Sequence, residues 1–510
     1  MPDSPPPYPS RTPPVPGARR SGRHRQERAR TTPAALLLTL IGTVVPGSGY
    51  VFAGRRRLGA LVMTLAGLLA GGVVYAGLER REQLIQLAVD PGKLLVLAVA
   101  LAVLAVAWVL VIVSSHRLLR PAAGGAAARV AGSAVVGLLC FAVAAPLAIG
   151  VQTALTQRSL VSSIFGNSRS ATRPSVDKND PWAGRPRLSL LLLGADDGVG
   201  RKGVRTDSVI VASIDTWTGQ TALISMPRKL MFMPFPVDSP LHERYPDGFG
   251  KDGITMKDRL EWMLDAMYDN VPEQNKDLLN GSDNKGADVL KLSVGEATGL
   301  RIDYYVQVNL KGFSDLVTAL GGITVNINYP IPVGGSDDAN VPPKRYLQPG
   351  PNQLLMGHDA LWYARGRYKV PNPDDARQAR QRCAIKAIAD KADPATLVRK
   401  YQALASASRN LIRTDIPADL LPAFVDLGLK VKSAEVVAVP LDGHALRFAY
   451  PHPDYDGLRK VIARALAAAP EPAATPSPST PTRVPQPSTR PATKHTEDLT
   501  DACAYHPDER

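Results

Sequence analysis

One segment of the sequence carries charged side chains at helical spacing, and their types suit a phosphate. Asp374, Arg377 and Gln381 stand at positions i, i+3 and i+7, so they share one face of a helix. That helix is expected over residues 374–391, and Arg380 flanks the shared face. Guanidinium groups that converge on one site could hold a pyrophosphate and stabilise charge on a transferred phosphoryl group. Taken alone, however, such a segment is more often a solvated, charge-laced helix.

Three further arginines stand where expected elements end. Arg365 and Arg367 close an apolar segment that predicts a helix over residues 353–366. Arg228 follows the strand expected over residues 221–225, which a proline terminates because it lacks a backbone donor. Each of these arginines alone is more often part of a surface ion pair, but together they could extend the phosphate cradle.

Two carboxylates follow or precede apolar strands and could bind a metal. Asp196 comes just after the strand expected over residues 188–193, and Asp207 stands just before the strand over 208–214, close to Arg205. The two strand edges can bring the carboxylates together at the rim of a sheet, where α/β proteins tend to bind ligands. Two hard oxygen ligands beside a phosphate suit Mg²⁺. Acidic turn residues are otherwise usually solvated or capping.

The elements that must position these residues alternate between strands and helices. Further strands are expected over residues 304–308 and 323–327, with a helix over 311–320 between them. This pattern predicts an α/β domain with a mixed central sheet and flanking helices. An α-helical transmembrane region precedes it.

Four apolar stretches make up this membrane region: residues 34–53, 58–78, 93–115 and 129–151. A spanning helix needs about twenty apolar residues, which the last three stretches supply. The first is interrupted by Pro46-Gly47 near its middle, a sequence that breaks a helix. It is therefore expected either to span the membrane or to enter and return on one side.

Arginines beside these stretches indicate the orientation. The N-terminal arm, Arg55–Arg57 and the loop over residues 117–129 are basic, so the positive-inside rule places all three in the cytoplasm. Three crossings then place everything after residue 152 outside the cell. Four crossings would instead place both termini on one side of the membrane.

These features divide the chain into five parts. We expect a disordered basic cytoplasmic arm (1–33), a membrane region (34–151), a linker (152–186), an extracytoplasmic catalytic domain (187–468, core 187–395) and a disordered tail rich in Pro, Thr and Ser (469–510).

Charge and cysteine content narrow the function classes. The 510 residues carry a net charge of +14, part of it beside apolar segments, which favours a membrane over a nucleic acid as partner. The three cysteines, Cys140, Cys383 and Cys503, form neither a metal cluster nor a disulfide framework. A bridge between Cys383 and Cys503 is possible in an exported domain.

Taken together, the segments resemble the LytR-CpsA-Psr (LCP) family over residues 187–395. The order and spacing of the motifs carry the resemblance, and the motifs are Leu190–Asp196, Arg205–Val209, Ser225–Arg228, Gly299–Tyr305, Gly312-Phe313, Leu320–Val325, Tyr363–Arg367 and Asp374–Gln381. The high Ala, Arg and Pro content suggests a GC-rich genome and an actinobacterial member of the family.

The resemblance implies a membrane-tethered phosphotransferase that faces away from the cytoplasm. Its α/β fold would enclose an apolar pocket for a polyprenyl chain, and it would move a glycopolymer from a polyprenyl pyrophosphate carrier onto peptidoglycan. Asp196 and Asp207 would hold Mg²⁺, and Asp374 would orient the arginines or help to activate the acceptor hydroxyl. The residues expected to contact the pyrophosphate are Arg205, Arg228, Arg365, Arg367, Arg377 and Gln381, with Arg380 as a further binding residue.

The sequence departs from the family pattern at two points. Lys229 stands where the family has an aspartate after Pro-Arg. The family's lysine before the Gly-Leu-x-Ile-Asp-Tyr-Tyr stretch has no match in the segment over residues 263–268, and Lys251 or Lys257 is the candidate substitute.

Two other functions remain compatible with these residues, and a third is disfavoured. The same site could admit water and act as a polyprenyl pyrophosphate hydrolase, or the domain could be a binding scaffold without catalysis. A membrane-bound transcriptional regulator is disfavoured, because the polar segments expected in the cytoplasm contain no recognisable helix-turn-helix. The identity of the glycopolymer and the acceptor sugar stay open.

Overall fold

The structure is a computed structural model, and it falls into two compact units. The membrane unit comprises Met1–Ala76 and Ala100–Gly150, and the globular unit comprises Gly77–Val99 and Val151–Arg510. The structure describes residues 32–120, 125–166, 168–178, 180–196, 203–335, 340–391, 412–439, 441, 452–467 and 496–506. The basic arm up to residue 31 and most of the tail lie outside the described residues.

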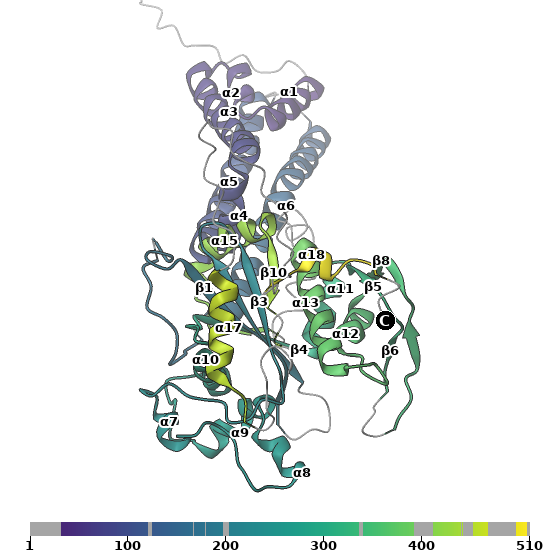
Figure 1. The fold of residues 1–510 in the computed structure, drawn as a ribbon. Helices are drawn as coiled ribbons and strands as arrows, with labels where there is room; N and C mark the ends of the chain where they lie inside the picture. The colour runs from purple at the N-terminus through teal and green to yellow at the C-terminus, as the bar shows by residue number, and fades with distance from the viewer. Residues whose placement is uncertain are drawn as a thin grey trace, which may run out of the picture. The chain divides into compact units, whose positions relative to one another are not determined.

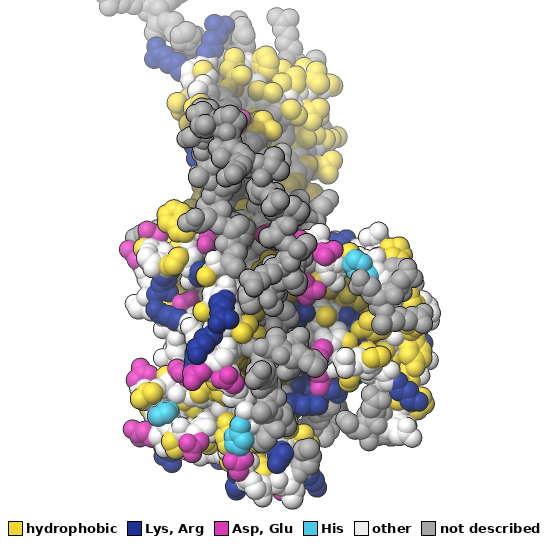
Figure 2. Space-filling view, viewed as in Figure 1, with side chains coloured by type: hydrophobic (Ala, Val, Ile, Leu, Met, Phe, Trp, Pro, Cys, Tyr) yellow, Lys and Arg dark blue, Asp and Glu magenta, His cyan; other side chains and the backbone are white. Residues whose placement is uncertain are grey.

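Long apolar helices dominate the membrane region. The structure places helices at α1 (Thr32–Val44), α2 (Ser48–Phe52), α3 (Arg56–Glu79), α5 (Pro91–Leu119) and α6 (Ala126–Phe165). Three of them, α3, α5 and α6, are long and apolar enough to cross a membrane. Hydrophobic side chains gather on the visible face of this region (Figure 2). The chain is therefore built for membrane anchoring.

The first apolar stretch does not form one long helix. It is divided into α1 and α2 around Gly47, whose φ of 101° a side chain would rarely adopt. With 13 residues, α1 is about 20 Å long, less than the roughly 30 Å of a bilayer's apolar core.

Polar contacts fasten this short helical pair to α5. The indole Nε1 of Trp108 donates to the carbonyl oxygen of Thr43 at 3.2 Å, and the hydroxyls of Tyr50 and Ser114 lie 2.5 Å apart. Hydrogen bonds of this kind hold helices together where the surrounding lipid offers no hydrophobic driving force.

A seven-stranded mixed sheet forms the centre of the globular unit. Its order is β11-β10-β3-β2-β1-β4-β9. The strands β1, β2 and β3 are antiparallel neighbours, whereas β4 runs parallel to β1 and β10 runs parallel to β3. The bounds are β1 (Arg187–Asp196), β2 (Arg205–Asp215), β3 (Thr221–Met226), β4 (Tyr304–Asn309), β9 (Ile412–Thr414), β10 (Val436–Val439) and β11 (Glu497–Asp498).

Both faces of this sheet are covered, which explains the continuous apolar run in β1. Leu191 and Leu193 pack into a large core with α9 (Met267–Gln274), α10 (Lys285–Thr298) and α17 (Tyr455–Ala467), which lie together in Figure 1. Leu188 packs into a core with α15 (Leu421–Ser433). Strands buried on both faces are apolar throughout rather than alternating. The predicted α/β fold, a mixed central sheet with flanking helices, is confirmed.

The segment between α3 and α5 packs against the globular part. It forms α4 (Arg81–Val89), which lies on α15. The amide of Gln86 donates to both carboxylate oxygens of Asp426, at 3.0 and 2.9 Å. This loop between two long apolar helices therefore belongs to the same compact unit as the central sheet.

Smaller sheets and three helices form a second layer beside the sheet. The antiparallel pairs are β5 (Ile323–Ile327) with β8 (Gly350–Leu355), and β6 (Ile331–Val333) with β7 (Arg345–Leu347). The helices are α11 (Leu310–Ala319), α12 (Gly357–Arg365) and α13 (Pro373–Lys391), as Figure 1 shows. The remaining short helices are α7 (Pro240–Arg244), α8 (Met256–Arg259), α18 (Leu499–Ala502) and the 3₁₀ turns Leu260–Trp262, Leu264–Ala266 and Ala418–Leu420.

The helix predicted over residues 353–366 is too long at its start. Residues up to Leu355 belong to β8 and pair with β5, so the helix begins at Gly357. A Cβ at Gly357 would lie 1.9 Å from the carbonyl oxygen of Ser314, which shows how closely α12 approaches α11. Pairing with a distant strand has overridden the local helical pattern.

The expected linker and tail are partly ordered. The helix α6 runs on to Phe165, and the backbone and side chain of Arg169 bind Asp283 beyond it. At the other end, residues 496–506 form β11 and α18 instead of continuing a disordered tail. A disulfide between Cys383 and Cys503, with Cα atoms 5.6 Å apart, ties this segment to α13.

Candidate active site

A bulge in β2 directs Asp207 out of the regular sheet. Gly194 pairs with Ser208 and Ala195 pairs with Thr206, so Asp207 has no partner of its own in β1. A Cβ at Gly194 would lie 2.9 Å from that of Ser208, so this close approach requires a glycine. Bulges of this kind turn a side chain toward a site beside the sheet.

Asp207 lines a polar cavity with a volume of about 570 Å³. The walls come from the ends of β2 and β3, the segment before α9, and the ends of α12 and α13. The charged residues that line it are Arg205, Asp207, Arg228, Lys229, Asp265, Arg365, Arg367, Asp374 and Arg377. Six cationic side chains face three carboxylates, so the cavity has an excess of positive charge and suits an anionic ligand.

Asp374 holds four of these cations around one carboxylate. Its oxygens lie 3.1 Å from Nζ of Lys229, 3.2 Å from Nη1 of Arg367, 3.4 Å from Nη2 of Arg377 and 3.5 Å from Nε of Arg228. Burial alone would raise the pKa of Asp374, but the adjacent cations outweigh it and hold the pKa below its usual value. Asp374 therefore stays ionised at neutral pH, with four cations arranged around its carboxylate.

Arg377 has unused hydrogen-bonding capacity beside the cavity. Only 3% of its side chain is exposed, and burial, helped by the neighbouring Arg228, lowers its pKa to about 10. It therefore remains charged at neutral pH. The Nε groups of Arg377 and Arg228 are both buried and donate no hydrogen bond. Buried donors without acceptors are costly, and a phosphate oxygen would satisfy them.

Asp265 is a site residue that the sequence reasoning missed. Its backbone N–H donates to the carbonyl oxygen of Arg228 at 3.1 Å, and its carboxylate lies 3.5 Å from Arg205 and 3.7 Å from Arg228. Burial raises the pKa of Asp265 to about 6 in spite of the two arginines. A single acid among the apolar residues 263–267 was the available signal.

Three predicted residues lie behind the cavity rather than in its lining. Asp196 is 2% exposed and pairs with Arg365 at 2.6 Å. Gln381 accepts a hydrogen bond from the hydroxyl of Ser208 at 3.1 Å. The guanidinium of Arg380 is buried, donates to the backbone carbonyl of residue 366 and lies 5.7 Å from the ring of Tyr329. Arg380 is therefore outside the lining of the cavity.

Neither candidate substitute for the family's lysine lines the cavity. Nζ of Lys251 lies 5.8 Å from the centre of the Trp262 ring, and Lys257 is exposed on α8. Lys229, which stands in place of an acid, lines the cavity and binds Asp374.

Two carboxylates of the cavity fit the donor set of a magnesium ion. Asp207 and Asp265 each place an oxygen near Nη1 of Arg228, at 3.2 and 3.7 Å. Oδ1 of Asp265 is buried and has no hydrogen-bond partner, and repulsion from Asp207 contributes to its raised pKa. Among the described residues no group of three or more His, Cys, Asp or Glu side chains could hold a metal. Mg²⁺ suits such a site because it uses one or two carboxylates and fills its shell with water and phosphate oxygens.

The sequence model of the LytR_cpsA_psr family matches residues 165–456, more than half of the chain. This chain belongs to that family. TagU of Bacillus subtilis (strain 168), a polyisoprenyl-teichoic acid–peptidoglycan teichoic acid transferase, is 27% identical over 268 residues, which are 52% of this chain and 71% of TagU. TagU of Enterococcus faecalis (strain ATCC 700802 / V583) is 30% identical over 46% of this chain and 62% of its own length.

A solved structure of a LytR-Csp2A-Psr enzyme from Actinomyces oris is also similar. It is 16% identical, with a TM-score of 0.36, over 58% of this chain and 96% of that protein. The family match confirms the resemblance to the LytR-CpsA-Psr family, and it covers the cavity and all of its charged residues.

Proposed function

We propose that this chain is a membrane-anchored phosphotransferase that moves a polyprenyl-pyrophosphate-linked glycopolymer onto peptidoglycan. The observation that carries the proposal is the arginine-lined cavity, which lies inside the segment that matches the family. Relatives in the family are named as teichoic acid transferases that use a polyisoprenyl carrier and peptidoglycan.

The arginines of the cavity are the proposed pyrophosphate ligands. Arg228 and Arg377 would fill their unused donors with phosphate oxygens, and Arg205, Arg365 and Arg367 would complete the cradle. Charge neutralisation by fixed, partly buried cations is worth more than in water and needs no reorganisation during the reaction. Gln381 and Arg380 are themselves part of α13. They would hold that helix in place through Ser208 and the backbone carbonyl of residue 366.

Asp207 and Asp265 would hold Mg²⁺, and Asp196, predicted as a ligand, would support the site through its pair with Arg365. A bound Mg²⁺ would neutralise part of the negative charge of the pyrophosphate. The cavity residues themselves would keep the pyrophosphate in line with an acceptor hydroxyl. Positioning and electrostatics provide most of the catalysis in phosphoryl transfer.

In the proposed reaction, the acceptor hydroxyl oxygen bonds to the phosphorus that carries the polymer. The bond from that phosphorus to the bridging oxygen breaks, and polyprenyl phosphate leaves with the electron pair. The hydroxyl proton ends on the departing phosphate. Asp374 orients the arginines in this scheme, because its carboxylate pairs with Arg228, Arg367 and Arg377.

We further propose that the globular unit faces away from the cytoplasm on a multi-pass anchor. The packing of α4 on α15 supports it, because the loop after α3 and the domain after α6 must then share one side of the membrane. Three crossings by α3, α5 and α6 satisfy this, with Arg55–Arg57 and the loop after α5 in the cytoplasm. The disulfide at Cys383 also suits an oxidising compartment.

The lipid that co-purifies with the full-length chain tests this function. We expect polyprenyl phosphate or pyrophosphate in extracts of the detergent-purified protein with Mg²⁺, identified by mass spectrometry. Arg377→Lys keeps the charge but loses the planar fork, and should reduce the bound lipid. Arg244→Lys is the matched control, because Arg244 is half exposed and pairs only with Asp277 among the described residues.

Loss of the lipid in Arg377→Lys with retention in Arg244→Lys supports the cradle. Absence of any polyprenyl lipid, even when it is supplied with Mg²⁺, contradicts the proposed function.

A further inference from the structure

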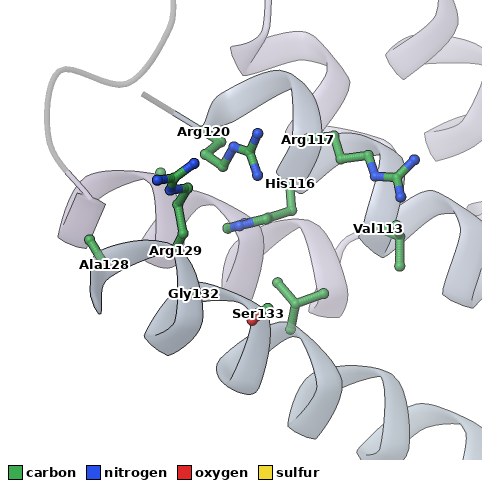
Figure 3. Close-up of a pocket in the computed structure, with 10 residues that line it drawn as sticks. Val113, His116, Arg117, Arg120, Ala128, Arg129, Gly132 and Ser133 are labelled. Atoms are coloured by element: carbon green, nitrogen blue, oxygen red, sulfur yellow. The ribbon is translucent and has the colours of Figure 1, made fainter. Parts of the chain in front are cut away.

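A second basic pocket is formed entirely by residues of the membrane unit. Its cavity has a volume of about 260 Å³, and the facing ends of α5 and α6 enclose it together with Ala35 of α1. His116, Arg120 and Arg129 lie close together there, while Arg117 extends on the other side of His116 (Figure 3). The proposed transfer reaction makes no use of these residues.

Among the described residues of the membrane unit, no acidic side chain balances this cluster. Residues 32–76, 100–120 and 125–150 contain six arginines and neither aspartate nor glutamate. None of the three arginines that line the pocket forms an ion pair among the described residues of the chain. Guanidinium groups that face one another repel. An anion between them attracts both, and this attraction outweighs their repulsion. The described residues of the unit therefore offer this cluster no negative charge, which an anionic ligand would supply.

The histidine in the pocket is fixed in place. Its Nδ1 shares a hydrogen bond with the hydroxyl of Thr39 at 3.0 Å. Its Nε2 lies beside Gly132 in the cavity wall, where an added Cβ would stand 3.6 Å away. The neighbouring Leu119 is fully buried and anchors the end of α5. Packing thus holds His116 and the end of α5 in place, while the three arginines of the lining are exposed.

The cavity is polar at one end and apolar at the other. The arginines stand at the ends of the two helices, next to the loop that joins them. Val113 and Val136 line the cavity farther into the apolar helices, about two turns from Arg120 and Arg129. Beyond them the helices expose apolar side chains such as Val106 and Leu138. A molecule with an anionic head and long apolar chains matches this gradient.

We propose that this pocket binds the phosphate headgroup of an anionic phospholipid, whose acyl chains run along α5 and α6. Basic pockets between transmembrane helices on the cytoplasmic side bind such headgroups, and anionic lipids are abundant in that leaflet. Arg120 and Arg129 supply two guanidinium forks for the phosphate oxygens. The proposal does not depend on the transferase function, because it uses none of its residues.

Lipid titration of the delipidated full-length protein, followed by native mass spectrometry, tests the proposal. The probes are phosphatidylglycerol and phosphatidylcholine with identical acyl chains, and inorganic phosphate alone. We expect phosphatidylglycerol to bind at least about tenfold more tightly than phosphatidylcholine. The double variant Arg120→Lys/Arg129→Lys keeps the charge that orients the chain but loses both forks, so this preference should disappear.

Arg55→Lys/Arg57→Lys is the matched control, since both arginines belong to the same unit and neither lines the pocket. The control should keep the full preference, and both variants should elute as the parent protein does. An equal loss in the two double variants would show a response to bulk charge and overturn the proposal. A parent protein without headgroup preference, or a lipid displaced by equimolar inorganic phosphate, would overturn it as well.

Discussion

The two basic pockets differ in what surrounds their arginines. In the globular unit, five arginines and a lysine share a cavity with three carboxylates, and Arg377 is almost fully buried. In the membrane unit, three exposed arginines and a histidine share a cavity to which no carboxylate contributes. The first pocket carries its own counterions, whereas the second depends on an anion from outside.

This difference indicates that the two pockets bind an anion for different purposes. Carboxylates such as Asp374 hold the arginines of the globular pocket in fixed positions before any ligand arrives. Preorganised charge of this kind serves catalysis, because the site does not rearrange as charge develops. In the membrane pocket no carboxylate of the lining holds the arginines in place. These exposed arginines suit reversible binding to an anionic membrane surface.

Removing a cation from the globular pocket should have the largest effect. For Arg377→Ala we expect glycopolymer transfer to fall about 10²- to 10³-fold, because a fixed donor to the transferred phosphoryl group is lost. Transfer of labelled polymer to peptidoglycan by the full-length protein measures it. Arg244→Ala removes the same charge at an exposed site and should leave the rate unchanged. Near-normal transfer by Arg377→Ala would show that the globular pocket does not catalyse the transfer, and would contradict the comparison.

The disulfide should matter to the helix that carries Arg377. Cys383 on α13 is joined to Cys503 across 120 residues of sequence. Cys503→Ser should lower the free energy of unfolding by about 2–4 kcal/mol, because a closed loop of this length restricts the unfolded chain. Thermal unfolding with and without reductant measures this, and the reductant should affect only the parent protein. A parent protein insensitive to reductant contradicts the expectation.

Removing an acid from the globular pocket should have a pH-dependent effect on stability. The folded pKa of Asp265, about 6, lies above the usual 3.8, so the folded state holds an extra proton between these values. The contribution of Asp265 to stability therefore falls as pH rises from about 4 to 6 and stays lower above 6. Asp265→Asn should then be more stable by on the order of 2 kcal/mol at pH 7.5, with no gain below pH 4.

Unfolding temperatures of both proteins from pH 4 to 7.5 measure this difference. Asp258→Asn is a suitable control, because Asp258 is exposed on α8. A variant less stable than the parent at pH 7.5 would show that the contacts of Asp265 with Arg205 and Arg228 outweigh its burial.

Adding an acid to the membrane pocket should have the smallest effect on the whole protein. Ser133 lines that pocket, and Ser133→Glu would add a negative charge to a lining that has none among the described residues. We expect phosphatidylglycerol binding to weaken about tenfold while glycopolymer transfer in detergent stays unchanged. Ala134→Glu, on an exposed position outside the lining, is the control. Unchanged lipid binding by Ser133→Glu would contradict the comparison.

Local patterns predicted the elements of the core and most of the cavity. The apolar run in β1 and the spacing of Asp374 and Arg377 on α13 depend on neighbours in sequence, so both could be predicted. The bulge that turns Asp207 toward the cavity could not, because it depends on how β1 and β2 align.

Features that depend on contacts between residues far apart in the chain could not be predicted from the sequence. Leu355 belongs to β8 because it pairs with Ile323 of β5, although the sequence around Leu355 favoured a helix. Arg380 stands only three residues from Arg377, but packing turned it toward Tyr329. Asp265 became significant only through burial beside Arg228, and the order of the segment around Cys503 depends on a bond to a residue far away in sequence.

The most direct test of the account is product analysis after one turnover by the full-length protein with a polyprenyl-pyrophosphate-linked glycopolymer and Mg²⁺. With peptidoglycan present, we predict covalent attachment of the polymer and release of one polyprenyl phosphate for each polymer attached. Release of the lipid at the same rate without peptidoglycan, with free polymer as the product, would make the protein a hydrolase and contradict the account.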